Sequence, residues 1–202
     1  MKFVNMNEVA FDPDTIIFPG LGNCHGVVYQ TNVGLFGFHI YGADKSTANK
    51  AIFFADFLKW HQKGNSATGQ KLYGVCPSNR YFTGALASQQ AELKVVAKAL
   101  GFTGPIEGAM WDTAKLGWST TYTECTLVDG KLNVAIQDFT GQNGTLGPCN
   151  AGLDHKAISV VAPLSFGGPQ PMTHGSLKTP AEVIVTAERK STPASAIQTA
   201  AF

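Results

Sequence analysis

The chain has 202 residues, of which 15 are Lys or Arg and 14 are Asp or Glu, so its formal net charge is +1. This length predicts one domain with a substantial core, and the even charge balance argues against a nucleic-acid partner or an anionic membrane surface. The N-terminal segment lacks a basic start followed by an apolar stretch, and no apolar run reaches the ~18 residues of a membrane span. We therefore expect neither a signal peptide nor a membrane segment.

Strands and helices are predicted to alternate along most of the chain. Two helices are expected, one over residues 44–63 and one from Ser88 to Leu100, where apolar side chains recur at helical spacing before Gly101. Asp129-Gly130 predicts a tight hairpin turn, because both residue types tolerate positive φ angles. Strands are expected at 14–18, 25–30, 33–41, 71–76, 106–110, 121–128, 131–139 and 182–188. This order predicts a mixed α/β fold in which layered sheets are flanked by two main helices.

Cys24 and His39 are the candidate catalytic residues. A two-residue turn at Thr31-Asn32 pairs the flanking strands so that Cys24 lies directly opposite His39. Opposed residues share one face of a sheet with Cβ atoms about 5 Å apart, so the imidazole can take the thiol proton and leave a nucleophilic thiolate. The backbone N–H groups of Gly22 and Asn23, in the turn before Cys24, are candidates for an oxyanion hole.

The other histidines and thiols are given structural roles. His25 follows Cys24 directly and therefore points to the opposite face of its strand, as a surface or cleft residue, which argues against a metal site. His61 is expected as a cation at the end of the first helix. A loop-surface or solvated position is expected for Asp154, His155 and His174. The disulfide state of Cys76, Cys125 and Cys149 stays open, with free buried thiols as the simplest interpretation.

The segment GLGNCHGVVYQTNVGLFGFHIYG (20–42) resembles the active-site hairpin of bacterial chemoreceptor glutamine deamidases, whose pattern G-L-G-S-C-V-G-V-V is followed by a turn and G-x-x-H. It also resembles the catalytic core of the cytotoxic necrotizing factor toxins, which share that fold and a Cys–His site. The order of predicted elements over residues 14–139 agrees with both families. The resemblance implies that Cys24 is the nucleophile and His39 the general base and acid. The implied reaction converts a glutamine amide into glutamate through a thioester.

Several departures from the chemoreceptor enzymes favour the toxin branch. The interval between Cys24 and His39 resembles the toxin spacing and is two residues shorter than in the chemoreceptor enzymes. Phe18 stands where those enzymes place the Thr that orients the histidine, and Thr15 would face the opposite way. Their Arg-rich turn has no counterpart in residues 111–121. The toxins orient the histidine through a backbone carbonyl, and the group that orients His39 stays open.

We therefore expect a protein-glutamine deamidase of effector or toxin type, acting on a protein substrate without a cofactor. The catalytic domain is expected over residues 1–165, followed by a partly ordered Pro/Ser/Thr/Ala-rich extension over 166–202 whose last dozen residues are loose. Both the bacterial cytoplasm and delivery by a non-classical route are compatible with this expectation. Two alternatives stay open: a non-catalytic protein-binding domain on the same scaffold, and a cysteine peptidase or amidase. The target protein, transfer of the acyl group to an amine, and the oligomeric state are also left open.

Overall fold

The computed structural model describes residues 1–41, 47–62, 67–80 and 85–139, together with the backbone of 152–153, 177–178 and 197–201. Its helices are α1 (Thr47–His61), the 3-10 helix η1 (Ser78–Arg80), α2 (Ala85–Leu100) and α3 (Thr113–Leu116). Its strands are β1 (Lys2–Phe3), β2 (Val9–Asp12), β3 (Thr15–Leu21), β4 (Cys24–Thr31), β5 (Gly34–Tyr41), β6 (Gly69–Pro77), β7 (Ile106–Trp111), β8 (Thr121–Val128), β9 (Lys131–Asp138), β10 (Gly152–Leu153), β11 (Leu177–Lys178) and β12 (Ile197–Ala201).

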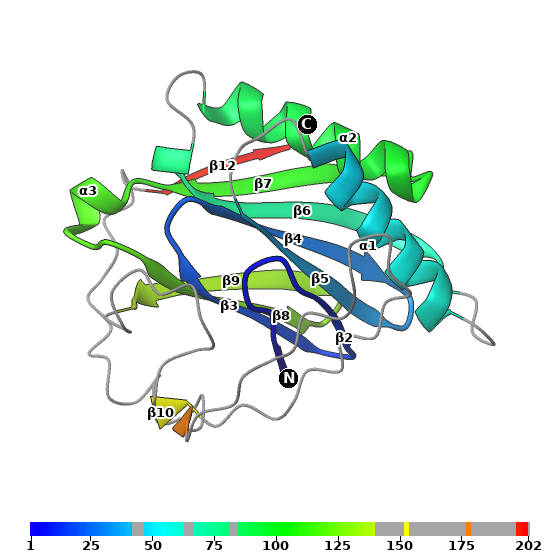
Figure 1. The fold of residues 1–202 in the computed structure, drawn as a ribbon, viewed down its shortest axis with the longest axis horizontal. Coiled ribbons are helices and arrows are strands. Elements are labelled where there is room, and N and C mark those ends of the chain that lie inside the picture. The colour runs from blue at the N-terminus through cyan, green and yellow to red at the C-terminus, as the bar shows by residue number, and fades with distance from the viewer. Residues whose placement is uncertain are drawn as a thin grey trace.

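Two sheets and a layer of helices make up the fold (Figure 1). One sheet has six strands in the order β12–β7–β6–β4–β5–β2, and the other has four in the order β1–β3–β8–β9. The helices α1 and α2 lie along the outer face of the six-stranded sheet, and β3, β8 and β9 lie on its other side. The mixed α/β class predicted from the sequence is confirmed. Within the described residues, no helix is long and apolar enough to span a membrane.

The central strand β4 is buried on both faces, and its alternate residues face the two layers. A Cβ atom added to Gly26 would lie 2.7 Å from the ring of Phe18 in β3, so the even-numbered residues of β4 face the four-stranded sheet. Tyr29 packs edge-on against Phe102, just after α2, with ring centroids 5.2 Å apart, so the odd-numbered residues face the helices. Burial on both faces explains why this strand is rich in apolar residues without a strict alternation.

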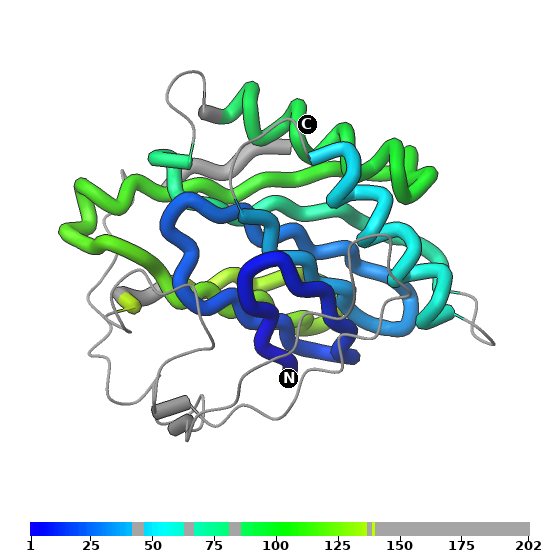
Figure 2. The backbone as a smooth tube through the Cα atoms, in the orientation of Figure 1, coloured from blue at the N-terminus to red at the C-terminus, as the bar shows by residue number. Residues whose placement is uncertain are grey.

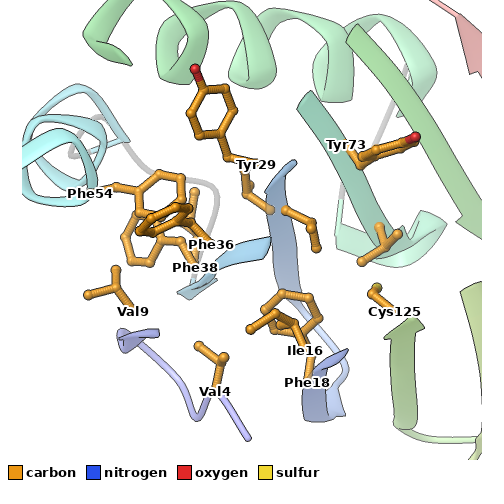
Figure 3. Close-up of a cluster of buried hydrophobic side chains, with 14 of the residues drawn as sticks. Val4, Val9, Ile16, Phe18, Tyr29, Phe36, Phe38, Phe54, Tyr73 and Cys125 are labelled. Carbon is orange, nitrogen blue, oxygen red and sulfur yellow. The ribbon is translucent and has the colours of Figure 1, made fainter. Parts of the chain in front are cut away.

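The hydrophobic core accordingly has two layers (Figure 3). On the helix side, the rings of Phe38 and Phe54 pack with centroids 5.4 Å apart. Between the sheets, Ile16 and Phe18 of β3 are completely buried. The two layers meet at β4 and β5, so the side chains on both faces of these strands are packed in the core.

The N-terminal segment joins the two sheets at one edge (Figure 2). Strand β1 pairs with β3 in one sheet, whereas β2 pairs with β5 in the other. The connecting loop is bonded to both, because Val4 N donates to Ile17 O (2.8 Å) and Asn7 N donates to His39 O (2.7 Å). Both strands are too short to give a period-two pattern, and the sequence analysis did not predict them.

The register predicted for the β4–β5 hairpin is wrong by two residues. Thr31 pairs with Gly34, so the turn consists of Asn32 and Val33, and Cys24 faces Tyr41 instead of His39. The Thr31 hydroxyl donates to Gly34 O (2.9 Å), which extends β4 by one residue. Gly34 adopts a φ of 140°, a backbone conformation that favours glycine, and this displaces the turn toward it.

Most other predicted elements are confirmed, with shifted ends. Strand β3 continues through Pro19 with an irregular register before Leu21, and α2 begins at Ala85, three residues ahead of the predicted start at Ser88. Asp129 and Gly130 both have positive φ, as the predicted turn requires. The expectation of a loose C-terminal dozen is wrong for 197–201, because β12 pairs with β7 at the edge of the six-stranded sheet. The strand predicted at 182–188 lies outside the described residues.

Candidate active site

Cys24 and His39 share the face of the six-stranded sheet that lies against the four-stranded sheet. His39 pairs directly with Gly26, so Cys24 is its diagonal neighbour, with Cα atoms about 7–8 Å apart in such a pair. A shift of two residues in register leaves both side chains on the same face of the sheet, because side chains alternate with a period of two. Both side chains are buried, with exposed fractions of 0% for Cys24 and 1% for His39. The structure thus brings the two predicted residues to one buried face, although not directly opposite each other.

A backbone carbonyl orients the His39 ring. Nδ1 lies 2.8 Å from Val4 O, and because a carbonyl oxygen only accepts hydrogen bonds, Nδ1 carries the proton. The main chain of His39 is fixed as well, since its N donates to Glu8 O (3.0 Å). Phe18 packs edge-on against the ring at 5.8 Å between centroids. The loop between β1 and β2 therefore orients His39, a role that the sequence left unassigned.

The Nε2 atom of His39 is a buried acceptor that has no hydrogen-bond partner among the described residues. It follows that no hydrogen bond joins it to the Cys24 thiol. Leaving a polar group buried and unpaired costs roughly 1–3 kcal/mol. Such a group on the same face as a cysteine is available to accept a proton.

Both side chains are neutral in this environment. Burial raises the pKa of Cys24 to about 11, although the charge of Arg80, the Gly22 N–H and the charge of Lys50 oppose the shift. Burial lowers the pKa of His39 to about 4, against the hydrogen bond to Val4 and with the help of the Arg80 charge. Near neutral pH the site therefore holds a thiol beside a neutral imidazole, and a preformed thiolate–imidazolium pair is disfavoured.

The turn before Cys24 presents its backbone to the thiol. The Gly22 N–H forms a hydrogen bond with the Cys24 sulfur that opposes the rise in the thiol pKa. The side chain of Asn23 is exposed, whereas its backbone carbonyl accepts a hydrogen bond from Arg80 Nη1 (2.7 Å). Of the two residues predicted for an oxyanion hole, Gly22 therefore directs its N–H to the Cys24 thiol, and Asn23 has its backbone carbonyl occupied.

His25 lies on the opposite face from Cys24, as predicted, but it is not a surface or cleft residue. It is completely buried, and its Nδ1 lies 2.9 Å from Glu92 Oε2 of α2. Packing of α2 over β4 and β6 covers this face, and Gly74 leaves room for the ring, since a Cβ there would lie 2.3 Å from His25 Nε2. The sequence pattern of one strand gives the face of a residue but not what covers it.

His61 is also placed differently from the prediction. It was expected as a cation at the end of the first helix, but its ring packs against Phe11 (4.3 Å between centroids) and Phe36 (5.2 Å). Burial in this aromatic cluster lowers the pKa of His61, which favours the neutral ring. Thr15 faces away from the site, as expected, toward Thr126 (3.4 Å between hydroxyls).

The remaining predicted residues have simple outcomes. Cys76 and Cys125 are free, buried thiols, which confirms the simplest interpretation for these two. Asp154, His155, His174 and Cys149 lie outside the described residues.

Three residues around the site were not predicted from the sequence: Val4, Arg80 and Glu92. Arg80 is one of only two arginines in the chain and comes four residues after the strand predicted at 71–76, and Glu92 interrupts the apolar stripe of a predicted helix. A rare arginine and a carboxylate on an apolar helix face are the sequence signals that could have indicated a buried ion pair. Val4 acts through its carbonyl, which every residue possesses, so no sequence signal could have identified it.

No protein-family model matches the chain, and no curated protein matches it in sequence. The geometry around Cys24 and His39 is therefore the basis for assigning a function.

Proposed function

We propose that the protein is a cysteine-dependent amidohydrolase that deamidates glutamine side chains of a protein substrate. The observation that carries the proposal is the buried, unpartnered Nε2 of His39 on the same face as the Cys24 thiol. The hydrogen bond from His39 Nδ1 to Val4 O supports it, because it directs the unprotonated nitrogen away from the loop and leaves it free as a base. The resemblance of residues 20–42 to the chemoreceptor deamidases and the necrotizing factor toxins supports the same reaction, and so do the layered sheets.

The chemistry begins from neutral groups. Cys24 Sγ attacks the carboxamide carbon of the substrate as its proton passes to His39 Nε2, and the new oxyanion accepts hydrogen bonds from backbone N–H groups of the Gly22–Cys24 turn. The C–N bond then breaks, and the proton on His39 passes to the leaving nitrogen, which departs as ammonia. Water, deprotonated by His39, hydrolyses the thioester to a carboxylate and restores the thiol. The net change is hydrolysis of the amide.

Replacement of either residue tests the proposal. Cys24→Ser and His39→Ala are expected to reduce ammonia release from glutamine-containing proteins by about 100-fold or more, because one removes the nucleophile and the other the base. Intact-mass analysis should show a gain of about 1 Da per modified glutamine with the wild type only. Cys125→Ser is the matched control, since Cys125 is another completely buried thiol. Wild-type activity in Cys24→Ser would exclude the mechanism, and cleaved fragments would indicate a peptidase.

A non-catalytic binding domain is the second candidate, and one observation favours it. Cys24 is completely buried, and burial raises its pKa to about 11, as expected for a structural thiol. This candidate predicts that ammonia release is at background level in the wild type, in Cys24→Ser and in His39→Ala alike. It also predicts that iodoacetamide near neutral pH does not label Cys24, either alone or in the presence of candidate substrate proteins.

A further inference from the structure

Arg80 bridges the chain segments that carry the two candidate catalytic residues. It lies in η1, directly after β6, and is buried with a 4% exposed fraction. Its Nη1 donates to Asn23 O (2.7 Å), in the residue before Cys24, and to Ile40 O (3.4 Å), in the residue after His39. A single guanidinium group therefore links the ends of β4 and β5 at the site.

Glu92 holds the Arg80 side chain in a two-point interaction. Arg80 Nε donates to Glu92 Oε2 (3.1 Å) and Nη2 donates to Oε1 (2.6 Å), and His25 Nδ1 lies 2.9 Å from Oε2. Burial alone would raise the pKa of Glu92, but His25 and Arg80 outweigh it and hold that pKa well below its usual range. The carboxylate is thus ionised, and such a forked contact leaves Arg80 little freedom to turn.

The contact with Asn23 has a geometric consequence for Cys24. All described peptide bonds are trans, and in a trans peptide the carbonyl and the following N–H point in opposite directions. Because Arg80 binds the Asn23 carbonyl, the direction of the Cys24 N–H is fixed as well. The N–H of a nucleophile is well placed to bind the oxyanion that forms on its own substrate.

Arg80 also brings a positive charge to the thiol. Together with the Gly22 N–H and Lys50, its charge opposes the effect of burial on the Cys24 pKa. Lys50 is less firmly placed, since it donates from an exposed position to Tyr41 O (2.6 Å). A buried and immobilised cation acts on a neighbouring group more strongly than an exposed one, because water screens it less.

We propose that Arg80, held by the Glu92 carboxylate that His25 also contacts, is a positioning residue for Cys24: it fixes the Asn23–Cys24 peptide and stabilises negative charge on the sulfur. The inference rests on the proposed role of Cys24 as the nucleophile. Its test requires no turnover, so failure of the deamidase assay and failure of this proposal are separate results.

The test is the pH dependence of Cys24 alkylation by iodoacetamide in the full-length protein, with peptide mapping to identify the adduct. Because Cys24 is completely buried, its rate also depends on opening of the fold, and the rate of the equally buried Cys125 in the same digest corrects for this at each pH. A charge effect then moves the pH at which the corrected Cys24 rate stops rising. In the double variant R80M/E92Q, which removes both charges and leaves no unpaired carboxylate, this pH should rise by about one unit. R80K keeps the charge and should stay near the wild type. K115M is the control, since Lys115 is an exposed cation on α3.

Two further measurements keep the test decisive. If R80M/E92Q does not fold, as judged by circular dichroism, R80Q/E92Q replaces it. The amide at position 80 can still donate to Asn23 O without a charge, no unpaired carboxylate is left, and the same upward shift is expected. Hydrogen exchange at neutral pH should show the Cys24 amide exchanging about tenfold faster in R80M/E92Q, which has no donor for Asn23 O, with the Val28 amide in mid-strand unchanged. A folded neutral variant with the wild-type alkylation profile would overturn the proposal, and so would unchanged exchange at Cys24 in folded R80M/E92Q.

Discussion

Two buried titratable residues next to each other respond to pH in opposite directions. Burial lowers the pKa of His39 to about 4 and raises that of Glu8 to about 7. The folded state therefore binds a proton more weakly than the unfolded state at His39 and more tightly at Glu8. As pH rises from about 4 to about 6.5, the titration of His39 raises the free energy of unfolding. As pH rises from about 4.5 to about 7, the titration of Glu8 lowers it. The two contributions largely offset each other in the wild type.

Glu8→Gln should expose the contribution of His39. The glutamine oxygen can still accept the hydrogen bond from Asn5 N (2.8 Å), so the main change is loss of the titration. Relative to the wild type, the free energy of unfolding of the variant should rise by about 3 kcal/mol between pH 4.5 and pH 7.5. Urea denaturation at several pH values measures this difference, and effects of other carboxylates cancel in it. Parallel curves for the two proteins would contradict the assignment.

At the scale of the elements, two glycines allow side chains to pack closely against the two faces of the six-stranded sheet, one glycine in β4 and one in β6. A Cβ on Gly26 would lie 2.7 Å from Phe18, on the side of His39, and 2.8 Å from Val75. A Cβ on Gly74 would lie 2.3 Å from His25 Nε2, on the side of α2. Atoms at these distances must move apart, so each position requires a residue without a side chain.

Gly26→Ala and Gly74→Ala should each lower the free energy of unfolding by about 1–3 kcal/mol, because the added methyl groups overfill two well-packed layers. Chemical denaturation measures the loss. Val134→Ala, a truncation at an exposed position of β9, is the control and should change stability by less than about 0.5 kcal/mol. Wild-type stability in both glycine variants would mean that the two layers are less tightly packed than the structure indicates.

The elements themselves were largely predictable. Strands β4 to β9 and helices α1 and α2 have clear apolar patterns and turn signals, and these depend on neighbouring residues only. The register of β4 with β5 was not predictable, because the choice between Thr31-Asn32 and Asn32-Val33 as the turn depends on contacts of Gly34. A Cβ at Gly34 would lie 2.7 Å from Pro13, which no pattern within the hairpin reveals.

On the scale of the whole molecule, β12 extends the sheet that carries the site. It pairs with β7 from Ile197, opposite Trp111, to Ala201, opposite Glu107. Without it, β7 would become an edge strand with unpaired backbone groups along its length. The C-terminal residues therefore contribute to the architecture of a sheet built mainly from the first half of the chain.

Removal of residues 197–202 should lower the free energy of unfolding by about 1–3 kcal/mol and promote self-association through the new edge. Urea denaturation and sedimentation velocity measure the two effects. A chain that lacks only Phe202 is the matched control, because it retains every paired residue of β12. An equally stable, monodisperse truncated chain would show that β12 does not stabilise the sheet.

The sequence by itself determined the α/β class, most of the elements, and the fact that Cys24 and His39 lie on one face of a hairpin. These follow from local rules: apolar periodicity, turn residues and the alternation of side chains along a strand. Only the tertiary structure decided that Val4 O orients His39, that Arg80 contacts the residue before Cys24, and that His25 is buried. These contacts join segments far apart in the chain, and two of the acceptors are backbone carbonyls, which carry no residue-specific signal.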